Sequence, residues 1–155
     1  MAVNTKKVDG RRALRLETVE DIRNEAKRLA STEVKTLGNW NVAQILEHLT
    51  KSMRLMRAND VDFKPNFFLK FMMKFMKNKF LNKGLPAGIQ PDEKIFSLVA
   101  PSSDKETPVA LEELAAFEAD HDFGPHPLLG KMTPQDHHNF NCRHCELHMS
   151  FVVDA

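Results

Sequence analysis

The sequence is poor in cysteine and contains no long apolar run, and both absences narrow the class of protein. Its two cysteines, Cys142 and Cys145, are too few for a disulfide scaffold and indicate reduced thiols. No uninterrupted apolar run approaches the roughly 20 residues that a membrane-spanning helix needs. The N-terminal residues carry charge but lack the apolar stretch of a signal peptide. We therefore expect a cytoplasmic protein without stable membrane insertion.

Strong net charge and nucleotide-binding motifs are lacking too. The formal net charge of +1 gives no overall attraction to nucleic acid. The chain contains no P-loop, no dinucleotide-binding fingerprint and no serine nucleophile elbow. The charge is unevenly spread, because residues 63–91 hold six lysines and no acid, whereas residues 104–122 hold seven acids and one lysine. These two segments are predicted to attract each other, within one molecule or between subunits.

What the sequence does contain is a helical pattern over most of a chain whose length suits one domain, residues 1–155. Capping residues followed by apolar residues at helical spacing mark the expected elements. Helices are predicted over residues 18–32, 41–57, 66–81, about 107–122 and 133–152, and a looser stretch at 90–107 could contain an extended piece. The predicted fold class is all-α, a four-helix bundle with an extra helix or loop excursion between the second and third core helices.

The segment 66–81 is unusually apolar for a surface helix. Lys70, Lys74 and Lys77 share one face, and phenylalanine, methionine and leucine cover most of the rest. Such a helix should be buried on several sides, against its own bundle or against a partner subunit. The alternative is a helix that lies on a membrane surface, because basic residues beside phenylalanine and methionine favour an anionic interface.

Histidines on the last predicted helix give the strongest chemical signal. His144 and His148 lie about 40° apart around a helix, and His137 falls between them in projection, on a face that is otherwise apolar. A buried imidazole needs a partner for both ring nitrogens, which a metal ion and a hydrogen bond together supply. His48, on the second predicted helix, lies at the edge of the apolar face and could face water or a neighbouring helix, where it would supply a third ligand. The simpler alternative is that each histidine is a core residue bonded to a carbonyl.

Two familiar zinc signatures do not fit. In the zincin motif a glutamate follows the first histidine, but here Cys145 occupies that position, and Glu146 points away from the histidine face. Cys142 and Cys145 have the spacing of a zinc knuckle, but no second pair completes four ligands. Cys142 projects nearly opposite the histidines, so we expect it on the outer face of the helix as an ordinary reduced thiol.

The remaining polar residues near these helices are expected to be solvated or to cap a helix. Loop histidines are usually solvated, which is the default interpretation for His121 and His126, and the alternative is that either one reaches the mouth of the bundle. His138 projects toward solvent. Asn41 and Glu47 are read as capping or solvated groups rather than ligands.

Three segments together resemble a known family. They are Gly38-Asn39-Trp40-Asn41-Val42-Ala43-Gln44-Ile45-Leu46-Glu47-His48-Leu49, His126-Pro127-Leu128-Leu129-Gly130-Lys131-Met132-Thr133, and the stretch from Arg143-His144 to His148. Over most of its length the chain is similar to the DinB-like superfamily and, more narrowly, to an uncharacterised bacterial branch of it. The resemblance implies a four-helix bundle with a metal ion bound by His48, His144 and His148. Members include thiol-dependent transferases and metal hydrolases, and they often form dimers.

The sequence therefore predicts a divalent-metal protein with a three-histidine site. Imidazole ligands suit Zn²⁺ and Ni²⁺ equally, and three protein ligands leave one position open to water or to a small thiol. The two enzyme hypotheses are a hydrolase, for which His137 is the weak candidate base, and a small-thiol transferase. The alternative is a non-enzymatic metal-binding or stress-related interaction protein.

Overall fold

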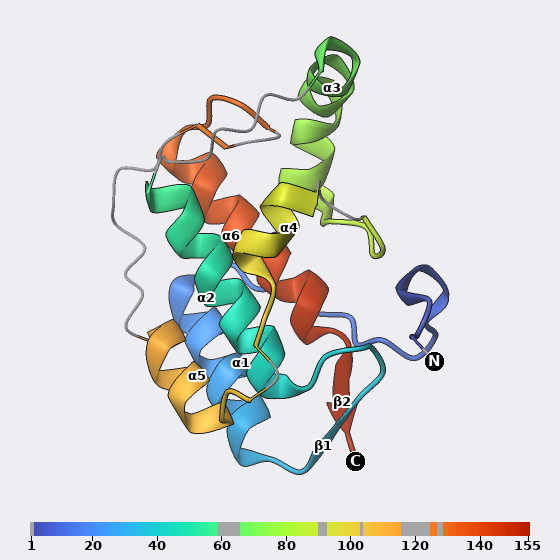
Figure 1. Ribbon diagram of the computed structural model, residues 1–155, viewed down its shortest axis with the longest axis vertical. Coiled ribbons are helices and arrows are strands. Elements are labelled where there is room, and N and C mark those ends of the chain that lie inside the picture. Colours follow the sequence, from blue (N-terminus) through green and yellow to red (C-terminus); the bar gives the residue numbers. More distant parts are fainter. Residues whose placement is uncertain (1, 59–65, 90–92, 103, 116–124, 127–128) are drawn as a thin grey trace.

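The computed structural model describes residues 2–58, 66–89, 93–102, 104–115, 125–126 and 129–155 (Figure 1). Its elements in chain order are η1 (Thr5–Lys7), α1 (Val19–Ser31), β1 (Val34–Thr36), α2 (Val42–Ala58), α3 (Phe67–Lys83), α4 (Glu93–Val99), α5 (Thr107–Ala115), α6 (Pro134–Met149) and β2 (Val152–Asp154). Helices thus dominate the described chain, which confirms the predicted all-α class. None of the helices within these ranges has both the length and the apolar character to cross a membrane.

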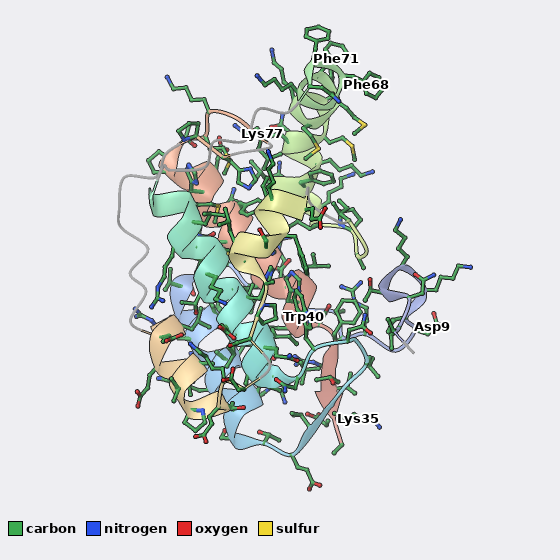
Figure 2. The ribbon with its side chains drawn as sticks, viewed as in Figure 1. Asp9, Lys35, Trp40, Phe68, Phe71 and Lys77 are labelled. Atoms are coloured by element: carbon green, nitrogen blue, oxygen red, sulfur yellow. The ribbon has the colours of Figure 1, made fainter. Side chains whose placement is uncertain are left out.

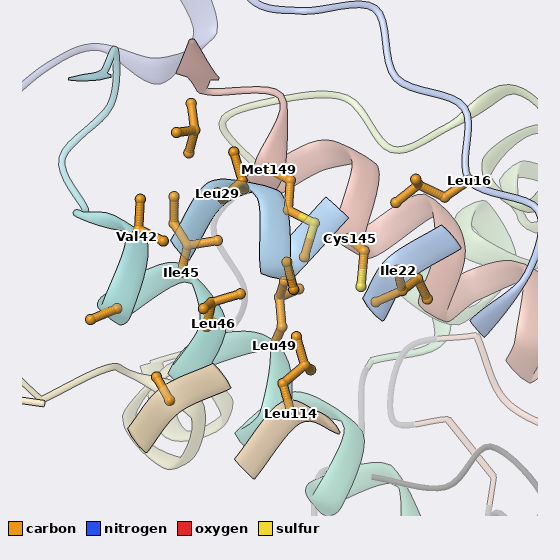
Figure 3. Packing of buried hydrophobic residues seen from close by; sticks show 14 of the residues in the cluster. Leu16, Ile22, Leu29, Val42, Ile45, Leu46, Leu49, Leu114, Cys145 and Met149 are labelled. Carbon is orange, nitrogen blue, oxygen red and sulfur yellow. The ribbon is translucent and has the colours of Figure 1, made fainter. Parts of the chain in front are cut away.

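Four helices enclose the main core. α5 packs along α2 and against α1, and α6 packs against α1 and α2, while α4 crosses α2 on another side (Figure 1). Figure 3 shows the apolar side chains that these helices direct toward one another. The largest fully buried apolar members are Leu29, Leu46, Leu49 and Met149. Burial of each such side chain contributes about 1.5–3 kcal/mol to folding, so this cluster holds the four helices together.

Hydrogen bonds to capping side chains explain where three helices begin. The Asp21 backbone N–H donates to the Thr18 hydroxyl at 3.0 Å, and the Gln44 N–H donates to the Asn41 side-chain oxygen at 2.9 Å. At the start of α6, the Asp136 N–H donates to the Thr133 hydroxyl at 3.1 Å. In each case the residue three positions on bonds back to the cap. The predicted starts of α1, α2 and α6 are confirmed.

Two predicted elements are wrong in kind or length. The expected extended piece within 90–107 is the short helix α4, whose Ile95 and Val99 are buried. The last helix ends at Met149 rather than near Val152, because Val152 begins a strand that pairs antiparallel with β1, opposite Thr36. This two-stranded ladder, which the sequence pattern did not predict, closes the end of the molecule near the C-terminus (Figure 1).

α3 departs from the expectation that it is buried on several sides. Its N-terminal half projects from the molecule, with Phe68 and Phe71 pointing outward (Figure 2), and only its C-terminal end, at Phe80 and Leu81, is buried. Lys77 donates to the Asp136 carboxylate on α6 at 2.7 Å, and residues 116–122 of the predicted acidic segment lie outside the described residues. Within one chain, therefore, the apolar face of α3 is largely uncovered.

Candidate metal centre

The three histidines lie on two helices that are far apart in the sequence. His48 lies in the middle of α2, and His144 and His148 lie one turn apart on α6. The capping boxes at Asn41 and Thr133 fix where each helix starts, and this sets which residues face the neighbouring helix. α2 and α6 pack together, so residues separated by about a hundred positions meet.

The ring nitrogens of these histidines converge on one point. His144 Nε2 lies 3.3 Å from His48 Nε2 and 3.1 Å from His148 Nε2, and the three ligand atoms lie within 4.8 Å of one another. A tetrahedral zinc ion holds imidazole nitrogens at about 2.0–2.1 Å, so neighbouring ligand nitrogens lie roughly 3.3 Å apart. The two short separations match that spacing. The donor set therefore suits a divalent metal ion, and two of its three separations have the spacing that such an ion requires.

The hydrogen bond of His48 selects the nitrogen that faces this point. His48 Nδ1 lies 2.8 Å from the Val99 carbonyl oxygen. A carbonyl can only accept, so Nδ1 carries the proton and donates it, and in the neutral ring Nε2 is left with its lone pair. An imidazole that donates its second N–H to a carbonyl is the usual arrangement of a metal-binding histidine. α4, which carries Val99, thus orients a ring on α2.

Burial favours the neutral form of all three rings. It is the main cause that lowers the pKa of His48, with the positive charge of Lys51 adding to it and the bond to Val99 opposing it. Burial also holds the pKa of His144 and that of His148 well below the ordinary value, and the neighbouring imidazoles lower both further. Neutral imidazole is the form that binds metal ions, so protons compete weakly for this site near neutral pH.

The histidines lie at the wall of a pocket of about 620 Å³. Trp40 packs over them, with its ring 4.7 Å from that of His48 and 5.5 Å from that of His148; Figure 2 shows Trp40 between α6 and the N-terminal segment. Gly38 lets this loop approach closely, because a Cβ there would lie 3.3 Å from the Phe151 ring. The pocket gives a small molecule access to the point where the nitrogens meet.

His126 also lines the pocket, and the expectation that it is solvated is wrong. Its Nδ1 accepts a hydrogen bond from the Leu129 N–H at 3.1 Å, and its ring lies 4.5 Å from that of Phe140. Paired backbone bonds between His126 and Gly130, both 2.8 Å, close a tight turn that Gly130 permits with a φ of +71°. Burial, and then the charge of His137, lower the pKa of His126 to about 3. The ring is therefore a neutral, fixed part of the wall.

His137 does not belong to the group of three convergent histidines. Its side chain is 2% exposed, and it is not among the described residues that line the pocket. Glu93, at the start of α4, does line the pocket, and no pattern in the sequence indicated it. The geometry thus gives no support for His137 as a base. His121 lies outside the described residues.

Three further expectations for polar residues are corrected. Cys142 is 1% exposed rather than on the outer face, because the N-terminal segment around Leu16 covers that side of α6. His138 is partly buried, and its Nε2 donates to the Glu17 carbonyl at 2.8 Å. Asn41 caps α2 as expected, but Glu47 is buried rather than solvated.

Glu47 links α2 to the connection that follows α4. Its carboxylate accepts from the Ser102 N–H at 2.9 Å and from the Lys51 ammonium group at 2.9 Å. Burial raises the pKa of Glu47, but the bonds from Lys51 and Ser102 outweigh this, so the pKa lies below its ordinary value. The residue before His48 thus holds the segment just after Val99, which is the hydrogen-bond partner of the His48 ring.

The fold and the site together define a mainly helical protein with a pocket beside three convergent histidines. A family model described as "Protein of unknown function (DUF1569)" matches residues 8–155, and the chain belongs to this family. No curated protein and no solved structure matches the chain.

Proposed function

We propose that this protein is a DinB-like four-helix-bundle protein that binds one divalent metal ion, Zn²⁺ or Ni²⁺, through His48, His144 and His148. The observation that carries the proposal is the convergence of one ring nitrogen from each of the three histidines within 4.8 Å. α1, α2, α5 and α6 are the proposed bundle helices, with α3 and α4 as the excursion between the second and third of them. The expected cytoplasmic location stays a prediction.

The pocket favours an enzyme over a purely structural metal protein. A structural zinc site is closed by four protein ligands. Here three histidines meet at the wall of a pocket whose volume is about 620 Å³. When bound, the ion supplies a Lewis acid with a position open to a thiol or to water. The chain's own residues orient His48 through Val99 and cover its ring with Trp40. A small-thiol transferase or a hydrolase is the proposed activity.

Elemental analysis of purified variants tests the ligand set. We expect about one metal ion per chain in the wild type and loss of the metal in His48→Ala, His144→Ala and His148→Ala, because two imidazoles hold a divalent ion poorly. His138→Ala is the matched control, since it removes a partly buried histidine of α6 that bonds to a carbonyl. Circular dichroism checks that each variant is folded. Retention of stoichiometric metal in the three ligand variants would show that the assignment is wrong.

A screen of small thiols with electrophilic acceptors, and of hydrolysable esters and amides, tests the reaction class with the metal-loaded protein. Turnover that disappears in His144→Ala supports a metal-dependent enzyme. Metal binding without turnover in either screen favours the alternative, a non-enzymatic metal-binding or stress-related interaction protein.

A further inference from the structure

Apart from the three histidines, the residues that line the pocket are mostly apolar. Trp40, Leu55, Met56, Phe80, Phe140 and Leu147 are among its lining residues. Phe96 of α4 stacks on Trp40 with 6.4 Å between ring centroids and extends the aromatic wall away from the histidines. A ligand that reaches the histidines therefore has its remaining atoms against hydrocarbon and aromatic rings.

The few polar groups of the wall offer little to a charged ligand. The described lining residues include no lysine and no arginine. The Asn39 amide is already engaged, because its oxygen accepts from the Val3 N–H at 2.6 Å and its nitrogen donates to the Val3 carbonyl at 3.0 Å. Glu93 is a carboxylate and would repel an anion.

Arg11, whose charge acts on His148, lies over the Phe151 ring. Its guanidinium already donates to the Ser150 hydroxyl and the Leu147 carbonyl. A substrate carboxylate buried in this pocket would lose its hydration without gaining a cationic partner from the wall.

We infer that the pocket selects an uncharged apolar ligand, with an aryl or branched alkyl body and one metal-binding head group, and that it rejects peptide-like or polyanionic thiols. That the head group binds at the three histidines rests on the proposed function. The preference for an apolar body rests only on the apolar residues that line the pocket. Apolar surface buried against the wall stabilises the complex, whereas a charge on the same body has no partner there.

Three hydroxamates with one head group and different bodies test this inference by calorimetry on the metal-loaded protein. Benzohydroxamate carries an apolar ring, acetohydroxamate carries only a methyl group, and 4-carboxybenzohydroxamate has the ring with an added charge. We expect benzohydroxamate to bind at least about ten-fold more tightly than either of the others. Equal binding, or tighter binding of the charged probe, would overturn the inference and leave the metal site untouched.

A pair of variants on α4 asks whether the wall itself causes the preference. Phe96→Glu places a carboxylate in the wall, and Phe96 is already 40% exposed, so the fold should tolerate the change. Leu98→Glu is the matched control, because Leu98 lies on the same helix, is 54% exposed and does not line the pocket. We expect about a ten-fold loss of benzohydroxamate affinity in Phe96→Glu only, with unchanged metal content. An equal effect of the two variants would contradict the assignment of the wall.

If the purified protein takes up no metal, probe binding still tests the apolar preference of the pocket separately from the proposed metal site. Saturation-transfer NMR on the metal-free protein then compares benzohydroxamate with 4-carboxybenzohydroxamate. Binding of the uncharged probe alone would support the apolar pocket while the proposed metal function fails. Binding of both probes, or of neither, would end the inference.

Discussion

The two thiols of α6 belong to the apolar core cluster, together with Leu16 of the N-terminal segment and Ile22 of α1. The Leu16 N–H donates to the Glu146 carboxylate at 2.7 Å, and the guanidinium of Arg143 donates to the Leu16 carbonyl. These bonds hold the N-terminal segment against α6, and Cys142 and Cys145 are 1% and 0% exposed. Burial, and then the nearby carboxylates, raise the pKa of Cys142 to about 12, and burial raises that of Cys145 well above its usual value.

We therefore expect both thiols to be inert in the native protein. At pH 8 a thiol with a pKa of about 12 is almost entirely protonated, and only the thiolate reacts readily with iodoacetamide. Intact mass after labelling should show no adduct in the folded protein and two in urea. Cys142→Ser should keep its metal but lose about 1–2 kcal/mol of stability, because it buries a hydroxyl group. Loss of metal in this variant would instead indicate a cysteine ligand.

At the scale of elements, α3 combines a docked end with an exposed aromatic face. Phe67, Phe68, Phe71 and Phe75 are 85%, 73%, 54% and 71% exposed, although monomeric proteins rarely expose so many neighbouring aromatic rings. Phe71 and Phe75 contact each other, with ring centroids 4.7 Å apart, so the face is continuous. This face is the proposed contact of a homodimer.

Light scattering after size-exclusion chromatography tests the dimer. We expect the wild type to be dimeric at micromolar concentration and the double variant Phe71→Glu with Phe75→Glu to be monomeric, because it places two carboxylates in an apolar contact. Lys74→Glu changes the net charge by the same amount but keeps every phenylalanine of the face, and this variant should remain dimeric. A monomeric wild type that sediments with anionic vesicles would favour the membrane-surface alternative.

Elements specified by neighbouring residues could be predicted from the sequence, and those specified by distant residues could not. Thr18, Asn41 and Thr133 cap helices through bonds that span three residues, so the pattern alone located those starts. The β1–β2 ladder joins residues 34–36 to residues 152–154, and α4 is a seven-residue helix held by its packing. Neither has a local signal strong enough to distinguish it from a loop.

The same distinction applies to the candidate site. His144 and His148 are one turn apart, so helical spacing alone brought them to one face. The role of Val99 and the cover over Cys142 depend on segments far away in the chain. The bonds that fix His126 join it to Leu129 and Gly130, which are near in the sequence, but no helical spacing marks them. For His48, helical projection allowed either a neighbouring helix or water, and only the packing of α2 on α6 decided between them.

At the scale of the whole molecule, the histidine cluster joins parts of the chain that lie far apart in the sequence. His48 belongs to α2, His144 and His148 belong to α6, and the Val99 carbonyl ties α4 to the same point. The unfolded chain has no such arrangement, so metal binding to the cluster is linked to global unfolding rather than to a local rearrangement.

This linkage predicts that Zn²⁺ raises the melting temperature. At a free concentration about 100-fold above the dissociation constant, an ion that binds only the folded state adds about 2.7 kcal/mol to the free energy of unfolding. For a chain of 155 residues this is a rise of roughly 5–10 °C. Scanning calorimetry should show the rise in the wild type and in His138→Ala, and a chelator should reverse it. In His144→Ala the rise should disappear, whereas an equal rise in this variant would mean that zinc stabilises the protein from some other site.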